Sequence, residues 1–239
     1  MKQPIHALIA TLALTSLPGF AMADISFNVG GVTDYRYRGI SQSRLNPALQ
    51  GGLDFSAGGF YLGAWGSSIK WIKDASGGNA SAEIDLYGGY KGELAKGFSY
   101  DVGLLTYQYP SNKLNPKAET TELYAAVTYG VTTLKYSHAV TNTFANPDSK
   151  NSYYLDISAT FDLGFATLTP HIGYQGIKGP LSEPASYTDY SLTLSKDISG
   201  LVLSLAVVGT DASKTFYASP VNGKALGKSA LVLGAKYNF

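Results

Sequence analysis

The chain has 239 residues, a formal net charge of +1 and no cysteine. The balanced charge gives no indication of a nucleic-acid partner, and the lack of cysteine excludes disulfide scaffolds and thiolate metal sites. Charged residues make up 15% of the chain, against about 25% in ordinary soluble domains, while glycine and tyrosine are abundant. This composition suits strands that have one face in lipid.

The N-terminus has the layout of a secretory signal peptide. Lys2 precedes an apolar run at residues 7–17, and Ala21-Met22-Ala23 forms an A-x-A cleavage site. We therefore expect residues 1–23 to be removed on export, leaving a barrel domain at residues 24–239. No later apolar run approaches the roughly 20 residues of a spanning helix, which excludes helical insertion. Position 24 is Asp rather than the Cys of a lipoprotein, so we expect no lipid anchor.

Alternation of apolar and polar residues predicts twelve strands separated by turn residues. They span residues 25–38, 48–56, 60–71, 81–91, 98–109, 119–129, 131–140, 151–161, 165–175, 187–196, 201–210 and 228–239. The connections alternate between short and long, as in outer-membrane barrels with short periplasmic turns and longer outer loops. The predicted fold is all-β: a transmembrane antiparallel up-and-down β-barrel of about twelve strands.

The last predicted strand ends in a terminal aromatic residue. Leu231, Leu233, Ala235, Tyr237 and Phe239 occupy every second position. A soluble β-sandwich can also end on an alternating strand, so this feature depends on the rest of the chain for its interpretation. In an outer-membrane barrel it resembles the C-terminal signal that the assembly machinery reads, and we expect Tyr237 and Phe239 to serve as that signal.

Side-chain parity places the charged residues on the less apolar face of each strand, which closure into a barrel turns inward. The expected pore-lining residues are Asp34, Arg36, Arg38, Asp54, Glu83, Asp85, Asp101, Glu122, Lys135, Asp156 and Asp189, accompanied by Lys70, Lys91, Lys196 and Lys236. These charges could set the ion selectivity of a passage. The alternative is a network of salt bridges that plugs the lumen, because about twelve strands lie between the filled eight-stranded case and the open sixteen-stranded case.

The motif Asp34-x-Arg36-x-Arg38 places three charges at the outer end of the first predicted strand. Two guanidinium groups there could attract anions. Alternatively, they could pair with carboxylates of neighbouring strands such as Asp54 or Glu83.

At two places the sequence does not decide whether side chains face the lumen or the lipid. In the third strand, an inward Lys70 turns Trp65 towards lipid but Leu62 towards the lumen. Tyr107 and Tyr109 share the parity of Asp101, so they either line the lumen or follow a bulge.

Aromatic residues are expected to form two girdles at the membrane interfaces. The periplasmic girdle would comprise Phe27, Phe55, Tyr90, Phe98, Tyr129, Phe161, Tyr237 and Phe239, and the outer girdle Tyr35, Tyr37, Trp71, Tyr153, Tyr174 and Tyr190.

Four motifs in the first hundred residues carry a family resemblance. They are VTDYRYRGISQ at residues 32–42, PALQGGLD at 47–54, GFYLGAW at 59–65 and EIDLYGGY at 83–90. With these motifs the chain resembles the TorF family of porin-like proteins. The resemblance implies an exported outer-membrane barrel whose transported solute is unassigned.

An enzyme hypothesis finds little support in the sequence. Some outer-membrane barrels of this size are phospholipases with a lipid-facing His and a Ser two residues further on. His138 has outward parity but is followed by Val140, and His171 points inward without a suitably spaced nucleophile. No His or carboxylate cluster has metal-ligand spacing, and no glycine-rich phosphate loop precedes a helix. We therefore expect no catalytic residue, cofactor or metal.

The sequence predicts a porin-like channel in the bacterial outer membrane for passive diffusion of small polar or ionic solutes. The alternatives are a closed structural or adhesin-like barrel that acts through its extracellular loops, and an outer-membrane lipid hydrolase. Expected partners are outer-membrane lipids and lipopolysaccharide, the barrel-assembly machinery and small polar solutes, but no nucleic acid. Lipopolysaccharide phosphates could contact the basic loop residues Arg44, Lys73, Lys113, Lys117, Lys150, Lys178, Lys214 and Lys224.

Overall fold

The computed structural model describes residues 23–239. The predicted signal peptide therefore lies outside the described residues, except for Ala23. The strands are β1 Asp24–Val32, β2 Arg36–Tyr37, β3 Ile40–Ser41, β4 Ala48–Ala57, β5 Phe60–Ser68, β6 Ala82–Ala95, β7 Phe98–Gln108, β8 Thr120–Tyr129, β9 Thr132–Ala139, β10 Tyr153–Ala159, β11 Phe161–Asp162, β12 Thr167–Gly176, β13 Tyr187–Ile198, β14 Leu201–Thr210 and β15 Ala230–Asn238. Two short helices are α1 Trp71–Asp74 and α2 Ser182–Ala185.

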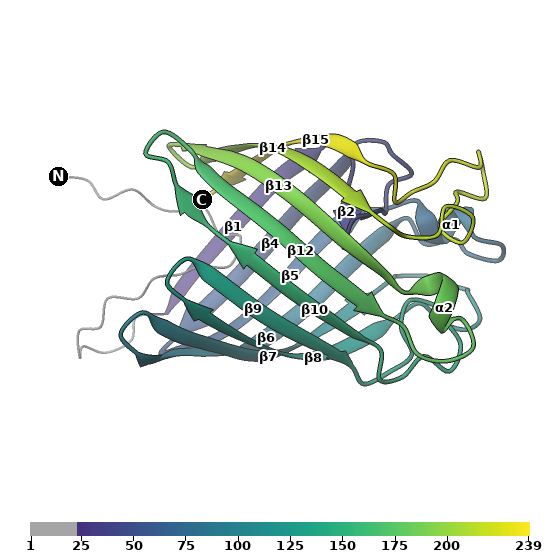
Figure 1. Ribbon diagram of the computed structural model, residues 1–239, viewed down its shortest axis with the longest axis horizontal. Helices are drawn as coiled ribbons and strands as arrows, with labels where there is room; N and C mark the ends of the chain where they lie inside the picture. Colours follow the sequence, from purple (N-terminus) through teal and green to yellow (C-terminus); the bar gives the residue numbers. More distant parts are fainter. Residues whose placement is uncertain (1–22) are drawn as a thin grey trace.

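The strands form one closed antiparallel barrel (Figure 1). The sheet runs in the order β10-β9-β8-β7-β6-β5-β4-β1-β15-β14-β13-β12-β11, and β10 also pairs with β12, so the order is circular. The first and last strands of the chain, β1 and β15, meet within this circle. Because β11 resumes β10 after a break at Thr160 and pairs with the same neighbour, the barrel has 12 spanning strands. The predicted fold class is confirmed.

The C-terminal residue completes the seam between β1 and β15. The two strands pair from Asn28↔Asn238 to Val32↔Gly234. Beyond this register, the backbone N–H of Phe27 donates to the Phe239 carbonyl at 2.8 Å, and the N–H of Phe239 donates back at 3.0 Å. The two rings stack at 5.8 Å between centroids. Phe239 therefore holds the first strand as well as ending the last one.

Long and short connections alternate around the barrel as predicted. The five short ones cover residues 58–59, 96–97, 130–131, 163–166 and 199–200, and the six long ones cover residues 33–47, 69–81, 109–119, 140–152, 177–186 and 211–229. We call the two ends the short-turn end and the long-loop end. Figure 1 shows the C-terminus at the first and both helices at the second.

Large apolar side chains cover the outward face of the strands. Ile157, Leu192 and Leu205 are among those with more than two fifths of their surface exposed. An apolar outer belt over a polar interior is the arrangement of barrels that sit in lipid. Among residues 23–239, neither helix has the length and apolar character needed to cross a membrane.

Two predicted strand ends are wrong, and the structure answers the open question of how the third strand faces. The first strand ends at Val32 rather than at residue 38, and the third ends at Ser68 rather than at residue 71, so Lys70 lies in a loop. Leu62 is 64% exposed and faces outward, while Trp65 packs inside at 5.4 Å from the Tyr35 ring.

Other side chains also differ from their predicted positions. Lys196 alternates with Leu194 and Ile198 on the exposed face of β13, so it does not face the lumen. Tyr35 is buried, and Tyr37 and Trp71 pack against the same interior cluster, which removes all three from the predicted outer girdle.

We expect Phe239→Ser to lower the yield of folded barrel, because it removes the ring stacked on Phe27 and the aromatic end of β15. An aromatic pair of this kind is worth about 1 kcal/mol beyond its buried area. The measurement is the fraction of heat-modifiable, folded protein in outer-membrane extracts. Phe165→Ser is the matched control, since Phe165 is exposed at the same end without such a pairing. Equal yields from both variants would contradict this role of Phe239.

Candidate functional site

The first long loop turns into the barrel. We call residues 33–47 the inward segment. Its β2 and β3 form a minimal hairpin in which Arg36 pairs with Ser41. The N–H of Ser41 donates to the Leu226 carbonyl at 3.0 Å, and the N–H of Lys70 donates to the Gln42 carbonyl at 2.8 Å. The segment is thus fixed to two other long loops, and Ile40, Ser41 and Ser43 are buried.

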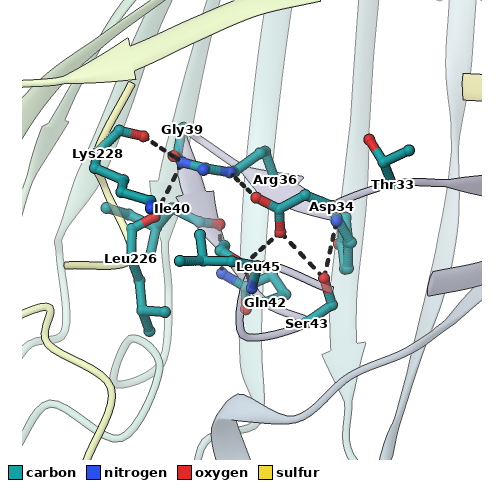
Figure 2. Close-up of polar contacts among 12 residues, drawn as sticks. Thr33, Asp34, Arg36, Gly39, Ile40, Gln42, Ser43, Leu45, Leu226 and Lys228 are labelled. Carbon is teal, nitrogen blue, oxygen red and sulfur yellow. Dashed lines mark hydrogen bonds and ion pairs between the residues drawn. The ribbon is translucent and has the colours of Figure 1, made fainter. Parts of the chain in front are cut away.

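Asp34 organises this segment (Figure 2). Its Oδ2 accepts a hydrogen bond from Nε of Arg36 at 2.5 Å, and its Oδ1 accepts from the hydroxyls of Ser41 at 2.5 Å and Ser43 at 3.2 Å. Nη1 of Arg36 donates to the carbonyls of Leu226 and Lys228, each at 3.0 Å. The carboxylate and the guanidinium are therefore committed to holding the loop in place.

Arg38 ties the inward segment to strands elsewhere in the barrel wall. Its Nη2 donates to Glu122 of β8 at 2.7 Å, and its Nη1 donates to Gln175 of β12 at 2.5 Å. The guanidinium carbon lies 4.2 Å from the centre of the Tyr154 ring of β10. Cation–π contacts of this kind gain strength when they are desolvated. One side chain thus bridges the loop to three strands.

The electrostatics keep Arg38 charged. Burial alone would lower the pKa of this loop guanidinium, but the adjacent Glu122 carboxylate acts in the opposite direction. The net pKa of Arg38 is well above its ordinary value. Because the Arg38 and Glu122 side chains are only 7% and 2% exposed, loss of either partner would leave a charge buried without compensation.

The arginine partners differ from those expected. Asp54 accepts instead from the Tyr87 hydroxyl at 2.5 Å, and Glu83 accepts from the Tyr35 hydroxyl at 2.5 Å. Side-chain parity along the strands could not identify Glu122 as the partner of Arg38. The Arg38–Glu122 pair depends on how far the inward segment reaches across the lumen.

Tyrosines pack with the inward segment in the long-loop half of the lumen. The Tyr37 hydroxyl donates to the Tyr107 hydroxyl at 2.6 Å, and Tyr107 donates to Glu122 at 3.3 Å. Tyr107 and Tyr109 are both buried, so the open question of their facing is answered: they point inward. Ile72 of α1, which is fully buried, belongs to the same cluster. This half of the lumen is densely filled.

Half-buried polar side chains continue towards the short-turn end. The Tyr61 hydroxyl donates to Asp101 at 2.5 Å and also contacts the Tyr124 hydroxyl. Nζ of Lys135 lies 4.1 Å from the centre of the Tyr124 ring. Sequence reasoning missed Tyr61, Tyr87 and Tyr124, although the last two share parity with charged residues of their strands.

His171 and two aspartates form a cluster on the wall made by β10, β12 and β13. Nε2 of His171 lies 2.7 Å from Asp156, and its Nδ1 lies 3.7 Å from Asp189. The Tyr154 hydroxyl donates to Asp189 at 2.9 Å. Sequence reasoning placed all three charged residues inward but did not bring them together, since the strand register decides which of them meet.

The expected pore-lining residues therefore fall into two groups. Asp34, Arg36, Arg38, Glu83, Asp85, Glu122 and Asp189 have buried side chains in the long-loop half, whereas Asp54, Asp101, Lys135 and Asp156 are half-buried nearer the short-turn end. All of these side chains lie on the inner side of the barrel. That they line an open pore stays a prediction.

His138 lies on the outward face, as its parity predicted. Its Nδ1 lies 3.1 Å from the Tyr136 hydroxyl, and its Nε2 lies 3.2 Å from the Asn151 side-chain oxygen. Two residues on, Val140 offers no nucleophile. Across residues 23–239, no group of three His, Cys, Asp or Glu side chains has a metal-binding arrangement.

Comparison with known families and proteins gives a family without an assigned function. The profile described as "Bacterial protein of unknown function (Gcw_chp)" matches residues 19–239. No curated protein matches the chain. The TorF name expected from the motifs is not part of the match, so that resemblance stays a prediction.

One solved structure supports the fold, and two others have lower similarity scores. A protein from a study of in-meso crystallisation of membrane proteins has 6% identity and a TM-score of 0.50 over 92% of this chain and 83% of its own. The COG4313 outer membrane channel from Pseudomonas putida F1 has 13% identity and a TM-score of 0.47 over 93% and 96%. Outer membrane phospholipase A from Escherichia coli has 16% identity and a TM-score of 0.46 over 90% and 95%.

We expect Arg38→Gln to destabilise the folded barrel, because it leaves Glu122 charged and buried without its partner. Breaking a buried pair on one side costs about 3–5 kcal/mol. The double variant Arg38→Gln/Glu122→Gln should recover most of this loss, since no charge is then left unpaired. The measurement is the unfolding midpoint in detergent for both single variants and the double variant. Additive losses in the double variant would show that the two side chains are not coupled.

Proposed function

The chain belongs to the Gcw_chp family of bacterial proteins of unknown function, and from its geometry we propose that it is an outer-membrane channel for passive diffusion of small polar or ionic solutes. The observation that carries this proposal is the polar inner wall. Charged side chains occur on it from Asp54 and Asp101 in the short-turn half to Glu83 and Asp189 in the long-loop half. A barrel needing only stability could fill its interior with apolar side chains, whereas a solute path needs polar groups.

One side of the inner wall carries small side chains. Near the middle of the wall, β14 presents Ser204 and Ala206 inward, β15 presents Gly234, and β1 presents Gly30, while the longer Lys236 points inward nearer the short-turn end. The tyrosines Tyr61, Tyr87 and Tyr124 lie on the wall formed by β5 to β8. This asymmetry supports a passage along the β14, β15 and β1 side, where the lining takes least room.

The inward segment makes any such passage narrow in the long-loop half. Its buried hairpin and Arg38 occupy space that solutes of any size would need. In the proposed orientation the short-turn end faces the periplasm, and the inward segment stands at the outer mouth. This arrangement suits small solutes and low conductance rather than the wide flow of a large porin.

The same ties favour a second candidate, a closed barrel that acts through its outer loops. The Arg38–Glu122 pair ties the inward segment to β8. Arg36 ties it to another long loop through hydrogen bonds to the Leu226 and Lys228 carbonyls. If the inward segment never leaves this position, the lumen does not conduct ions or solutes, and the long loops carry the activity.

Contacts with lipopolysaccharide and the assembly machinery are part of the proposal. The basic loop residues lie at the long-loop end, where lipopolysaccharide phosphates would be. Arg44 is the least available of them, because its guanidinium pairs with Asp74. The terminal strand, with Tyr237 and Phe239 on its outward face, is the segment that we propose the assembly machinery recognises.

The test is a planar-bilayer recording of the purified protein. We expect small conductance steps from the native chain and larger steps when residues 36–40 are replaced by Gly and Ser, because the variant lacks Arg38 and the hairpin that narrow the lumen. The control replaces residues 220–224, a stretch of the same length in another long loop. This stretch is exposed, so the control should conduct as the native chain does. If neither the native chain nor the 36–40 variant conducts, the closed barrel is correct and the channel is not.

A further inference from the structure

Six hydroxyl side chains occupy the inner wall between the inward segment and the short-turn end. On their strands they share the inward parity of His171, Asp189 and Ala206, and all six are half-buried. They are Thr167 and Thr169 of β12, Ser191, Thr193 and Ser195 of β13, and Ser204 of β14. We call these six residues the hydroxyl patch.

The strand register places these hydroxyls side by side. Thr169 lies opposite Thr193 in the pairing of β12 with β13. The adjacent row crosses four strands and consists of Thr167, Ser195, Ser204 and Gly234. Side chains that face each other in an antiparallel pair have Cβ atoms about 4.5–5.5 Å apart. The hydroxyl patch is therefore contiguous, and it borders the small side chains of β14 and β15.

The hydroxyl patch has hydrogen-bonding capacity that the protein does not use. Within residues 23–239, none of its six hydroxyls bonds to another protein group. On the opposite wall, by contrast, the hydroxyl of Tyr87 donates to Asp54 and that of Tyr61 donates to Asp101. A hydroxyl has one donor and two acceptor positions. The patch can therefore exchange hydrogen bonds with a solute, whereas the tyrosines and acids of the opposite wall already engage each other.

The hydroxyl patch carries no formal charge. On β13 the inward charged residues are Asp189 and Asp197, one beyond each end of the patch, and β14 has no charged residue. An ion that moves along this wall loses hydration without meeting a counter-charge. A neutral solute with many hydroxyls loses less, because bonds to the wall replace its bonds to water.

We propose that the hydroxyl patch is the solute-binding surface of the lumen and that the channel passes small neutral polyols and sugars. This inference rests on the proposed channel function and names its solute class. The patch adjoins the side of the lumen where the lining takes least room. At its long-loop edge, Asp189 packs against the inward segment, since a Cβ added at Gly39 would lie 2.8 Å from the Asp189 Cβ. A solute that passes the inward segment therefore meets the hydroxyls next.

The experiment is osmotic swelling of proteoliposomes that contain the purified protein, with erythritol or arabinose as the neutral solute. The test variant is Thr169→Val/Thr193→Val, which replaces two facing hydroxyls by methyl groups and keeps the β-branched shape. We expect its swelling rate to fall about fivefold, as for the loss of roughly one net hydrogen bond along the path. Its KCl conductance in a planar bilayer should change far less, because ions interact with the charged opposite wall.

Thr128→Val/Thr133→Val is the matched control. These two half-buried inward threonines lie opposite each other on β8 and β9, and their hydroxyls bond to each other at 2.8 Å. The control loses the same number of hydroxyls outside the hydroxyl patch, so its swelling rate should equal the native rate. Heat-modifiability establishes that both double variants are folded.

The outcomes separate this inference from the function on which it rests. A native chain that conducts KCl but admits neither erythritol nor arabinose would overturn the solute class and leave the channel in place. Equal swelling rates of the native chain and Thr169→Val/Thr193→Val, or equal losses in both double variants, would do the same. A native chain that neither swells nor conducts would overturn both proposals. Slower swelling confined to Thr169→Val/Thr193→Val supports the hydroxyl patch.

Discussion

The structure depends on closure of the sheet between β1 and β15. A strand with a free edge cannot remain in lipid, because each unpaired backbone group there costs several kcal/mol. The pairing from Asn28 to Val32, extended by the mutual hydrogen bonds of Phe27 and Phe239, removes that edge. Once the sheet is closed, alternation along every strand sends one set of side chains outward to lipid and the other inward. The apolar belt and the polar interior are both consequences of this closure.

The polar interior creates the next requirement. Buried charges are tolerated only with partners, and the inward segment supplies two of them. Arg36 is fixed by Asp34 within the segment. The positively charged Arg38 donates hydrogen bonds to Glu122 and Gln175 on other strands. The segment fills the long-loop half and thereby makes it narrow. In this half of the described chain, five carboxylates are buried together with only two guanidinium groups.

Strand number, loop alternation and the facing of most charged residues could be predicted from the sequence, because a period of two and turn residues are local signals. The path of the inward segment could not. Asp34, Arg36 and Arg38 alternate with Tyr35 and Tyr37 as a strand would. The hydroxyls of Ser41 and Ser43 bend the chain back onto Asp34 instead.

The facing of the third strand could not be decided from the sequence for a related reason. Its parity was anchored on Lys70, which lies beyond the end of β5. The Arg38–Glu122 pair joins residues 84 positions apart, and only the three-dimensional packing reveals it.

The most direct test of this account is whether the inward segment is folded into the barrel. The chain has no cysteine, so single cysteines can be labelled cleanly in the folded protein with a bulky, membrane-impermeant maleimide. Ile40, which is 6% exposed in the segment, and Val221, which is 56% exposed in another long loop, make a matched pair. We predict rapid labelling of Val221→Cys and labelling of Ile40→Cys only after heat denaturation. Labelling of Ile40→Cys as fast as Val221→Cys would contradict it.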